Sequence, residues 1–169
     1  MCNPNWLPEK LNNVATGNAQ TILPRLFNFF KTDFIDDPAF LNDYKIDWDR
    51  TLEENYERGF WHIISKEQIN RLGEKERLLD PPRAEKLPWA RPLIDNHGDS
   101  FFVKCWDYEE NPREIRTYIW LENHDYVFIV RKCKTPSSPK AFIVTAFHID
   151  GNSTRRRLMQ KWHNRLQGS

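Results

Sequence analysis

The feature that most constrains the fold is a series of four apolar, strand-like runs in the C-terminal part of the chain. They cover residues 100–107, 115–121, 125–132 and 140–149. The turns between them are short and contain Asn or Pro. Because short turns join neighbouring antiparallel strands, this pattern predicts a four-stranded antiparallel β-meander.

Helical patterns dominate the sequence before these strands. Residues 20–34 place apolar side chains near helical spacing. Thr51 and Glu54 have the spacing of a capping box, which predicts a second helix before Gly59. Residues 65–73 begin with Ser and end with Gly, so they predict a third, short helix.

Two further segments complete the predicted fold. Residues 80–95 contain four prolines, which exclude regular helix and central strand and predict an ordered loop. In the tail, Leu158, Trp162 and Leu166 are spaced four apart, which predicts a closing amphipathic helix.

The chain of 169 residues is long enough for one hydrophobic core. We expect an α+β fold with N-terminal helices, then a four-stranded antiparallel β-meander, then a C-terminal helix. Residues 1–50 are expected to form an N-terminal helical extension. Residues 51–169 are expected to form one compact domain.

Period-two alternation assigns faces to the predicted strands. In the second strand Arg116, Tyr118 and Trp120 share one face, and the first strand similarly presents Lys104 and Trp106. Basic side chains interleaved with flat rings can neutralise phosphates and stack on bases. The alternative is that this face packs beneath the N-terminal helices.

Charge is unevenly distributed along the chain. The net charge is +1, but residues 101–169 carry 12 Lys and Arg against 7 Asp and Glu. A basic region of this kind favours a polyanionic partner, although Arg155, Arg156 and Arg157 could instead solvate a helix face. The acidic N-terminal segment is interpreted as a helical pedestal, with a docking arm or a cover for the basic face as alternatives.

Several functional classes lack their usual motifs. The three cysteines show no CxxC spacing, the histidines show no metal-ligand spacing, and phosphate-binding loops are absent. We therefore expect no metal and no cofactor. No apolar run reaches the roughly 18 residues of a membrane span, and the N-terminus does not resemble a signal peptide, so we expect a cytoplasmic protein without a membrane partner.

The remaining candidate residues suit RNA cleavage without a metal. This reaction requires a group that titrates near neutrality, cations for the phosphate and an oriented hydroxyl. His62 lies in an apolar stretch, where it is either a proton-transfer group or a buried, hydrogen-bonded histidine. Thr145 lies in the most apolar strand, where it either supplies a hydroxyl to the site or is an ordinary β-branched strand residue. His148 falls on the opposite strand face from Thr145 unless a bulge intervenes.

Five sequence blocks in this order resemble the phage-associated members of the Barnase, EndoU, colicin and RelE-like nuclease superfamily, the PBECR domains. The similarity covers about residues 59–161. The blocks are FWHII, RAEKLPWARPLID, VKCWD, TYIWLENHDYVFIVRK and FIVTAFHID. The resemblance implies a compact α+β domain and metal-independent RNA cleavage in toxin, phage-conflict or prophage settings.

The resemblance also implies roles for individual residues. His62 matches the general acid or base, Arg91 a phosphate clamp beside the packing anchor Trp89, and Thr145 a residue that orients the scissile phosphate. The role of His148 stays open, because an apolar residue is usual there. Further candidates for binding RNA are Arg83, Trp106, Arg116, Tyr118, Trp120 and Arg131.

The leading hypothesis is therefore a toxin-type endoribonuclease that acts on tRNA or mRNA and could be neutralised by an antitoxin or immunity protein. The alternative is a catalytically inactive RNA-binding or partner-binding module on the same fold. Transfer of an ADP-ribosyl group is a third class, but no glutamate is placed to support it.

Overall fold

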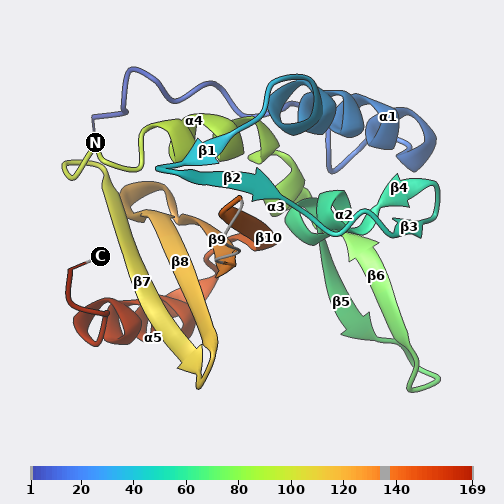
Figure 1. Cartoon of the computed structure of the whole chain (residues 1–169). Coiled ribbons are helices and arrows are strands. Elements are labelled where there is room, and N and C mark those ends of the chain that lie inside the picture. Colours follow the sequence, from blue (N-terminus) through green and yellow to red (C-terminus); the bar gives the residue numbers. More distant parts are fainter. Residues whose placement is uncertain (1, 134–137, 169) are drawn as a thin grey trace.

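A mixed six-stranded sheet forms the centre of the computed structural model, which describes residues 2–133 and 138–168 (Figure 1). Part of the predicted turn between the last two strands, residues 134–137, lies outside the described residues. In spatial order the strands are β1 Phe40–Leu41, β2 Tyr44–Asp47, β10 Lys140–His148, β9 Tyr126–Cys133, β8 Glu114–Leu121 and β7 Val103–Asn111.

The predicted α+β class and the meander from β7 to β10 are confirmed, since these strands pair antiparallel in chain order. The prediction of four strands and a purely antiparallel sheet is wrong. β2 pairs in parallel with β10, and β1 pairs antiparallel with β2 at the edge of the sheet. β2 is only four residues long, which is too short for alternation to reveal it in the sequence. Residues 1–50 thus contribute two strands as well as helix.

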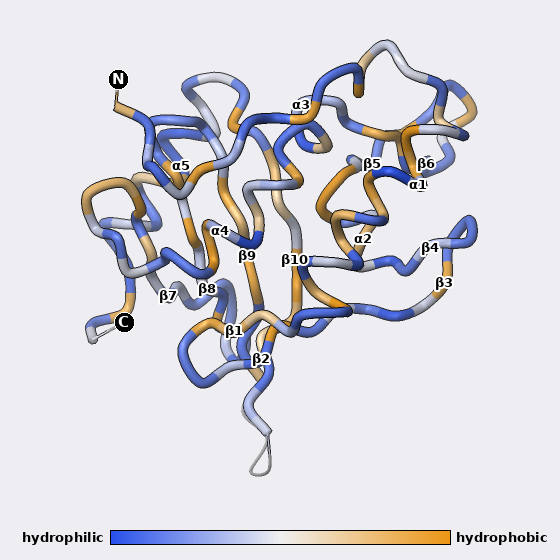
Figure 2. The backbone as a smooth tube through the Cα atoms, turned by 90° about the horizontal axis from the view of Figure 1, so that it is seen from above, coloured by the Kyte–Doolittle hydropathy of each residue, from blue (hydrophilic) through white to orange (hydrophobic). Residues whose placement is uncertain are grey.

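Helices cover both faces of this sheet. One face packs against α1 and α2, which share a large hydrophobic core with the strands. Figure 2 shows how hydrophobic residues gather along the central strands β9 and β10. The helical segments on this face are α1 Ala19–Phe30, a π-helical continuation Lys31–Asp36, α2 Arg58–Ile64 and α4 Ala90–Asp95.

The other face of the sheet packs beneath α5, Gly151–His163, which confirms the predicted C-terminal helix. Leu158 of α5 is buried against Trp106, Tyr118 and Trp120 of the sheet. Burial of one leucine side chain contributes about 2 kcal/mol. The basic and aromatic face is therefore covered, but by the C-terminal helix and not by the N-terminal helices.

Two β-hairpins stand where helices were predicted. The first consists of β3 Leu52–Glu53 and β4 Tyr56–Glu57, and α2 begins only after it. Glu54 and Asn55 at its turn both have positive φ, 49° and 71°, as a type I′ hairpin turn requires. The interpretation of Thr51 and Glu54 as a capping box is wrong, because residues 52–57 form this hairpin and no helix begins at Thr51.

The second hairpin consists of β5 Ser65–Ile69 and β6 Lys75–Leu79, and it extends away from the sheet (Figure 1). The side chain of Asn70 accepts hydrogen bonds from the N–H groups of Leu72 and Glu74, and Gly73 has a φ of +79°. This tight turn reverses the chain where a third helix was predicted. Ser65 does not cap a helix start, because its hydroxyl donates to the carbonyl of Trp61 at the end of α2.

The proline-rich stretch is more ordered than predicted. It forms α3 Pro81–Ala84, a 3-10 turn Leu87–Trp89 and α4. The loop prediction is wrong because the prolines fall in the first turns of these short helices, where the missing N–H costs nothing. In the part of the chain described here, no helix is both long and apolar enough to cross a membrane.

Candidate active site

A β-bulge in β10 determines the orientation of Thr145. The pairing of β10 with β9 shifts between Ile143 and Thr145, so Val144 is an extra residue. Ala141 and Ile143 face the hydrophobic core shared with α1 and α2, and after the bulge Ala146 takes the next core position. Thr145 therefore points away from the core, which regular alternation would not produce.

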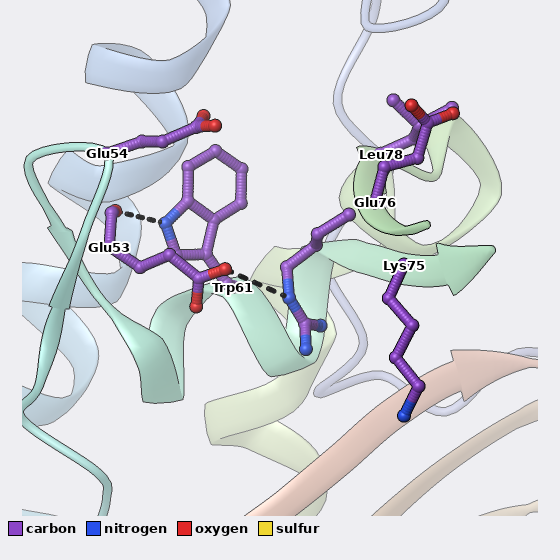
Figure 3. A pocket seen from close by; sticks show the side chains of 7 residues that line it. Glu53, Glu54, Trp61, Lys75, Glu76 and Leu78 are labelled. Carbon is purple, nitrogen blue, oxygen red and sulfur yellow. Dashed lines mark hydrogen bonds and ion pairs between the residues drawn. The ribbon is translucent and has the colours of Figure 1, made fainter. Parts of the chain in front are cut away.

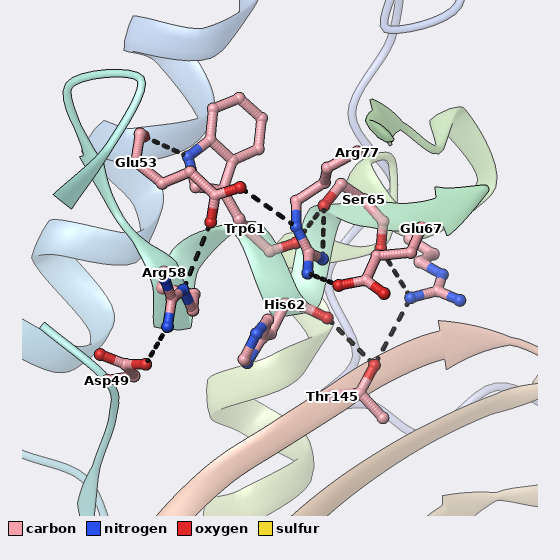
Figure 4. A network of polar contacts seen from close by, with 10 residues as sticks. Asp49, Glu53, Arg58, Trp61, His62, Ser65, Glu67, Arg77 and Thr145 are labelled. Atoms are coloured by element: carbon pink, nitrogen blue, oxygen red, sulfur yellow. Dashed lines mark hydrogen bonds and ion pairs between the residues drawn. The ribbon is translucent and has the colours of Figure 1, made fainter. Parts of the chain in front are cut away.

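The hydroxyl of Thr145 joins β10 to α2. Its Oγ1 donates a hydrogen bond to the carbonyl oxygen of His62 at 3.0 Å (Figure 4). This contact fixes the last turn of α2 against the bulged strand. Because the proton of Thr145 is used by this bond, Thr145 positions the His62 backbone.

Arg83 of α3 reaches the same point. Its Nη1 donates to the carbonyl of Ser65 at 2.7 Å and to Oγ1 of Thr145 at 3.4 Å, and its Nε lies 3.3 Å from a carboxylate oxygen of Asp80. Burial lowers the pKa of Arg83 from its usual value, although the group stays a cation at neutral pH. A guanidinium is thus held beside Thr145 by three partners.

The imidazole of His62 is half-buried and has a free nitrogen. Its Nδ1 is buried without a hydrogen-bond partner, and Nε2 makes no hydrogen bond to any residue that the structure describes. Burial is the main cause that lowers the pKa of His62 below 6.5, and the nearby positive charge of Arg77 lowers it further. His62 is therefore neutral at pH 7 and can accept a proton.

These groups line a shallow cavity of about 250 Å³, which we call the reaction hollow. α2, the β5–β6 hairpin, α3 and β10 all contribute to it (Figure 4). Its lining residues are His62, Ser65, Lys66, Glu67, Arg77, Arg83, Val144 and Thr145. His62, two guanidinium groups and the hydroxyl of Thr145 therefore line one surface that solvent reaches. The carbonyl of His62 faces Thr145, while its ring lies on the side of Asp49 and Arg58 (Figure 4).

Carboxylates balance the cations of the reaction hollow. Arg77 pairs with Glu67 at 2.7 Å and approaches Glu53 at 3.9 Å, and Asp80 pairs with Arg83. The carboxylate side chain of Glu67 is 51% exposed, so its ion pair is weak and can exchange for another anion. A phosphate that enters the hollow must compete with Glu67.

A second cavity of about 360 Å³ lies between the two hairpins (Figure 3). Arg77 lines this cavity as well as the reaction hollow. The rest of the wall holds Glu53, Glu54 and Glu76 around the indole of Trp61, together with the cation of Lys75. With three carboxylates against two cations, this side of the hollow favours a polyanion less than a basic wall would.

Arg91 lies apart from the reaction hollow. Its guanidinium donates to the carbonyls of Asp33 and Asp37, both at 2.7 Å, and pairs with Asp95 at 2.9 Å. These bonds anchor the π-helical segment to α4, so the predicted phosphate clamp is replaced by a structural contact. Trp89 is a packing anchor as expected, since it is buried and its indole donates to the carbonyl of Pro8.

The predicted RNA-stacking side chains are also separated from solvent. Trp106, Tyr118 and Trp120 are at most 3% exposed beneath α5, so bases cannot stack on their faces. Arg116 and Arg131 remain at the surface, as cross-strand neighbours on β8 and β9. Alternation alone could not show that α5 covers the rings.

Sequence reasoning missed Ser65, Lys66, Glu67 and Arg77. All four belong to the β5–β6 hairpin, whose first part, residues 65–73, was predicted as a helix. The Asn70 to Gly73 turn was the one local indication of a hairpin.

His148 lies on the opposite face of β10 from Thr145, as alternation predicted. Its Nδ1 contacts the carbonyl of Asp125 at 3.0 Å and also the ammonium of Lys86, and its Nε2 lies 3.5 Å from Asp150. Lys86 is buried, which lowers its pKa to about 8. Both ring nitrogens of His148 are thus occupied.

Within residues 2–133 and 138–168, no group of three or more His, Cys, Asp or Glu side chains is placed to hold a metal ion. Comparison with protein-family models, with curated proteins and with solved structures finds no match for this chain.

Proposed function

We propose that this protein is an endoribonuclease that cleaves RNA by attack of a 2′-hydroxyl on the adjacent phosphate. The observation that carries the proposal is that His62, Arg77, Arg83 and Thr145 line one open hollow. They come from four elements, α2, β6, α3 and β10, and together they supply a proton acceptor, two cations and a positioning hydroxyl. The resemblance to PBECR nucleases supports the same chemistry.

In the proposed reaction, Nε2 of His62 removes the proton from the 2′-hydroxyl. The 2′-oxygen then forms a bond to phosphorus and the bond from phosphorus to the 5′-oxygen breaks. The departing 5′-oxygen takes a proton from water, which the open hollow admits. The products are a 2′,3′-cyclic phosphate and a 5′-hydroxyl, and the proton on His62 is released to solvent.

The two guanidinium groups stabilise the charge that develops on the phosphate oxygens. Arg83 is the more firmly positioned of the two, because a carbonyl, a hydroxyl and a carboxylate all hold it. Arg77 becomes available when phosphate displaces Glu67. Preorganised donors of this kind account for about 3 kcal/mol of barrier lowering each.

The carboxylates around the hollow favour the second candidate, a catalytically inactive RNA-binding or partner-binding module. Glu67, Glu53 and Asp80 already neutralise the two arginines, so weak phosphate binding without turnover is the alternative outcome. On either reading, the partners are RNA and a neutralising protein such as an antitoxin or immunity protein, and a cytoplasmic location fits both.

The direct test is incubation of the purified protein with a single-stranded RNA oligonucleotide in EDTA. We expect 2′,3′-cyclic phosphate ends, no cleavage of the 2′-O-methyl oligonucleotide, and a loss of rate of about 100-fold or more in His62→Gln. Intact RNA, or equal cleavage by His62→Gln, would refute the proposed mechanism.

A matched pair of arginines tests which cation acts. Arg83→Gln should lower kcat by about 100-fold, because it removes a donor at the phosphate. Arg91→Gln comes from the same proline-rich stretch but should leave kcat within about twofold and lower the melting temperature. A larger kcat loss in Arg91→Gln than in Arg83→Gln would reverse the assignment.

A further inference from the structure

A groove runs between α5 and the sheet and meets the reaction hollow at Thr145. It has a volume of about 250 Å³. Thr145 lines both spaces, so the two are neighbours on the surface. The lining of the groove consists of Arg116, Tyr118, Ile129, Thr145, Phe147, Thr154, Arg157, Leu158 and Lys161.

We propose that a single RNA strand leaves the reaction hollow across Phe147 and continues along this groove, which we call the α5 groove, with Arg157 and Arg116 binding its phosphates. The proposal rests on the proposed function, because it extends the same substrate beyond the reacting phosphate. It assigns the substrate class as single-stranded RNA of at least a few nucleotides.

The sizes of the two spaces favour an extended ligand. Each space is smaller than the pockets of about 300 Å³ or more that enclose a small-molecule ligand. Two small, adjacent spaces that open to the surface instead fit successive nucleotides of one RNA strand. Phe147 connects them, since its ring lies 5.6 Å from the guanidinium carbon of Arg83 and also lines the α5 groove.

Charge gives the groove its selectivity for a polyanion. Its described lining residues include Arg116, Arg157 and Lys161 but no carboxylate. Lys161 is held by Glu110 and by the hydroxyl of Tyr118, and Arg116 pairs with Glu114. Arg157 is exposed and makes no ion pair with any residue that the structure describes, so its charge is fully available to a phosphate.

The neighbours of Arg157 on α5 differ from it. Arg155 is engaged by Glu122 and Asp125, away from the α5 groove. Arg156 is exposed like Arg157 but does not line the groove, because it lies about 100° around the helix. Arg156 is therefore a control of the same residue type, exposure and helix.

The opposite side of the hollow supports the same path. The cavity between the hairpins carries Glu53, Glu54 and Glu76 against Lys75 and Arg77, so its lining has more carboxylates than cations. The α5 groove is thus the one of the two neighbouring spaces whose charge suits RNA. An acidic protein segment is the competing occupant, and the experiment includes it as an outcome.

The test measures binding of a fluorescent 2′-O-methyl single-stranded RNA, which cannot react, by full-length wild type, Arg157→Ala and Arg156→Ala. We expect Arg157→Ala to weaken binding by about threefold to tenfold. The slope of log affinity against log salt concentration should also become shallower, by about the amount that one phosphate contact contributes. Arg156→Ala should stay within about twofold of wild type, and the melting temperatures of both variants should match wild type.

The outcomes separate the groove from the reaction. Equal RNA affinity of the two variants would overturn the proposal that RNA binds along the α5 groove, even if the protein cleaves RNA through His62. Arg157-dependent RNA binding without any cleavage would support the groove and refute the nuclease proposal. Binding of polyglutamate but not of RNA in an Arg157-dependent manner would also overturn the proposal, because the occupant would then be an acidic polypeptide.

Discussion

Each face of β10 has a histidine and a cation near it, but the two histidines differ in what they contact. On one face His62 approaches Thr145 through its carbonyl, while Nδ1 of its ring is buried without a hydrogen-bond partner among the described residues. On the other face the ring of His148 contacts Asp125, Lys86 and Asp150. The difference teaches that a histidine near a cation is poised for chemistry only where a ring nitrogen remains free.

The largest expected effect separates the two histidines by activity. His62→Gln should reduce kcat by about 100-fold or more, because it removes the proton acceptor. His148→Gln should change kcat by less than about threefold, since its ring nitrogens serve structural contacts. Both are measured by RNA cleavage under single-turnover conditions. A loss in His148→Gln as great as in His62→Gln would erase the distinction between the two faces.

A smaller effect is expected at the contact between Thr145 and His62. Thr145→Val should lower kcat by about tenfold and destabilise the fold by about 1–2 kcal/mol, because the His62 carbonyl loses its donor. Thr145→Ser keeps the hydroxyl and should restore most of kcat, while KM stays near wild type in both variants. If Thr145→Val loses stability but keeps full kcat, the contact is structural alone.

The smallest expected effect concerns Lys86 and appears in stability. Burial lowers its folded-state pKa to about 8 from an ordinary value of 10.5. Between these pH values the unfolded chain binds a proton that the folded protein has released, so wild type gains stability relative to Lys86→Met as pH rises from about 8 to 10.5. The gain should be about 1–3 kcal/mol by chemical denaturation.

The control for this measurement is Lys45→Met, an exposed lysine on β2. The difference in free energy of unfolding between Lys45→Met and wild type should not change over the same pH range. A pH-independent difference for Lys86→Met would mean that Lys86 is not desolvated by the packing around His148.

The sequence predicted the parts of the fold that follow simple periodicity. β7 and β8 alternate, β9 and β10 are short apolar runs between turns, and α5 repeats its apolar residues at helical spacing. The short strand β2 could not be predicted, because its pairing with β10 depends on tertiary contact. The two hairpins were misread because helix-capping residues also occur in tight turns, and the turns prevailed.

The candidate site was only partly predictable for a similar reason. His62, Thr145 and Arg83 were named from the sequence, and they lie together. Arg91 was predicted to bind phosphate, but its guanidinium instead binds the carbonyls of Asp33 and Asp37. The sequence could not show this contact, because these residues come from a distant segment. Alternation alone places Thr145 in the core, and only the bulge at Val144 turns it toward His62.

The pH dependence of kcat/KM for RNA cleavage tests most directly whether the free imidazole of His62 is the proton acceptor. Burial and Arg77 lower the pKa of His62 below 6.5, so the rate should be constant at neutral pH and fall tenfold per pH unit below that lowered pKa. The residual activity of His62→Gln should lack this acidic limb. An identical acidic limb in His62→Gln would contradict the account, since another group would then accept the proton.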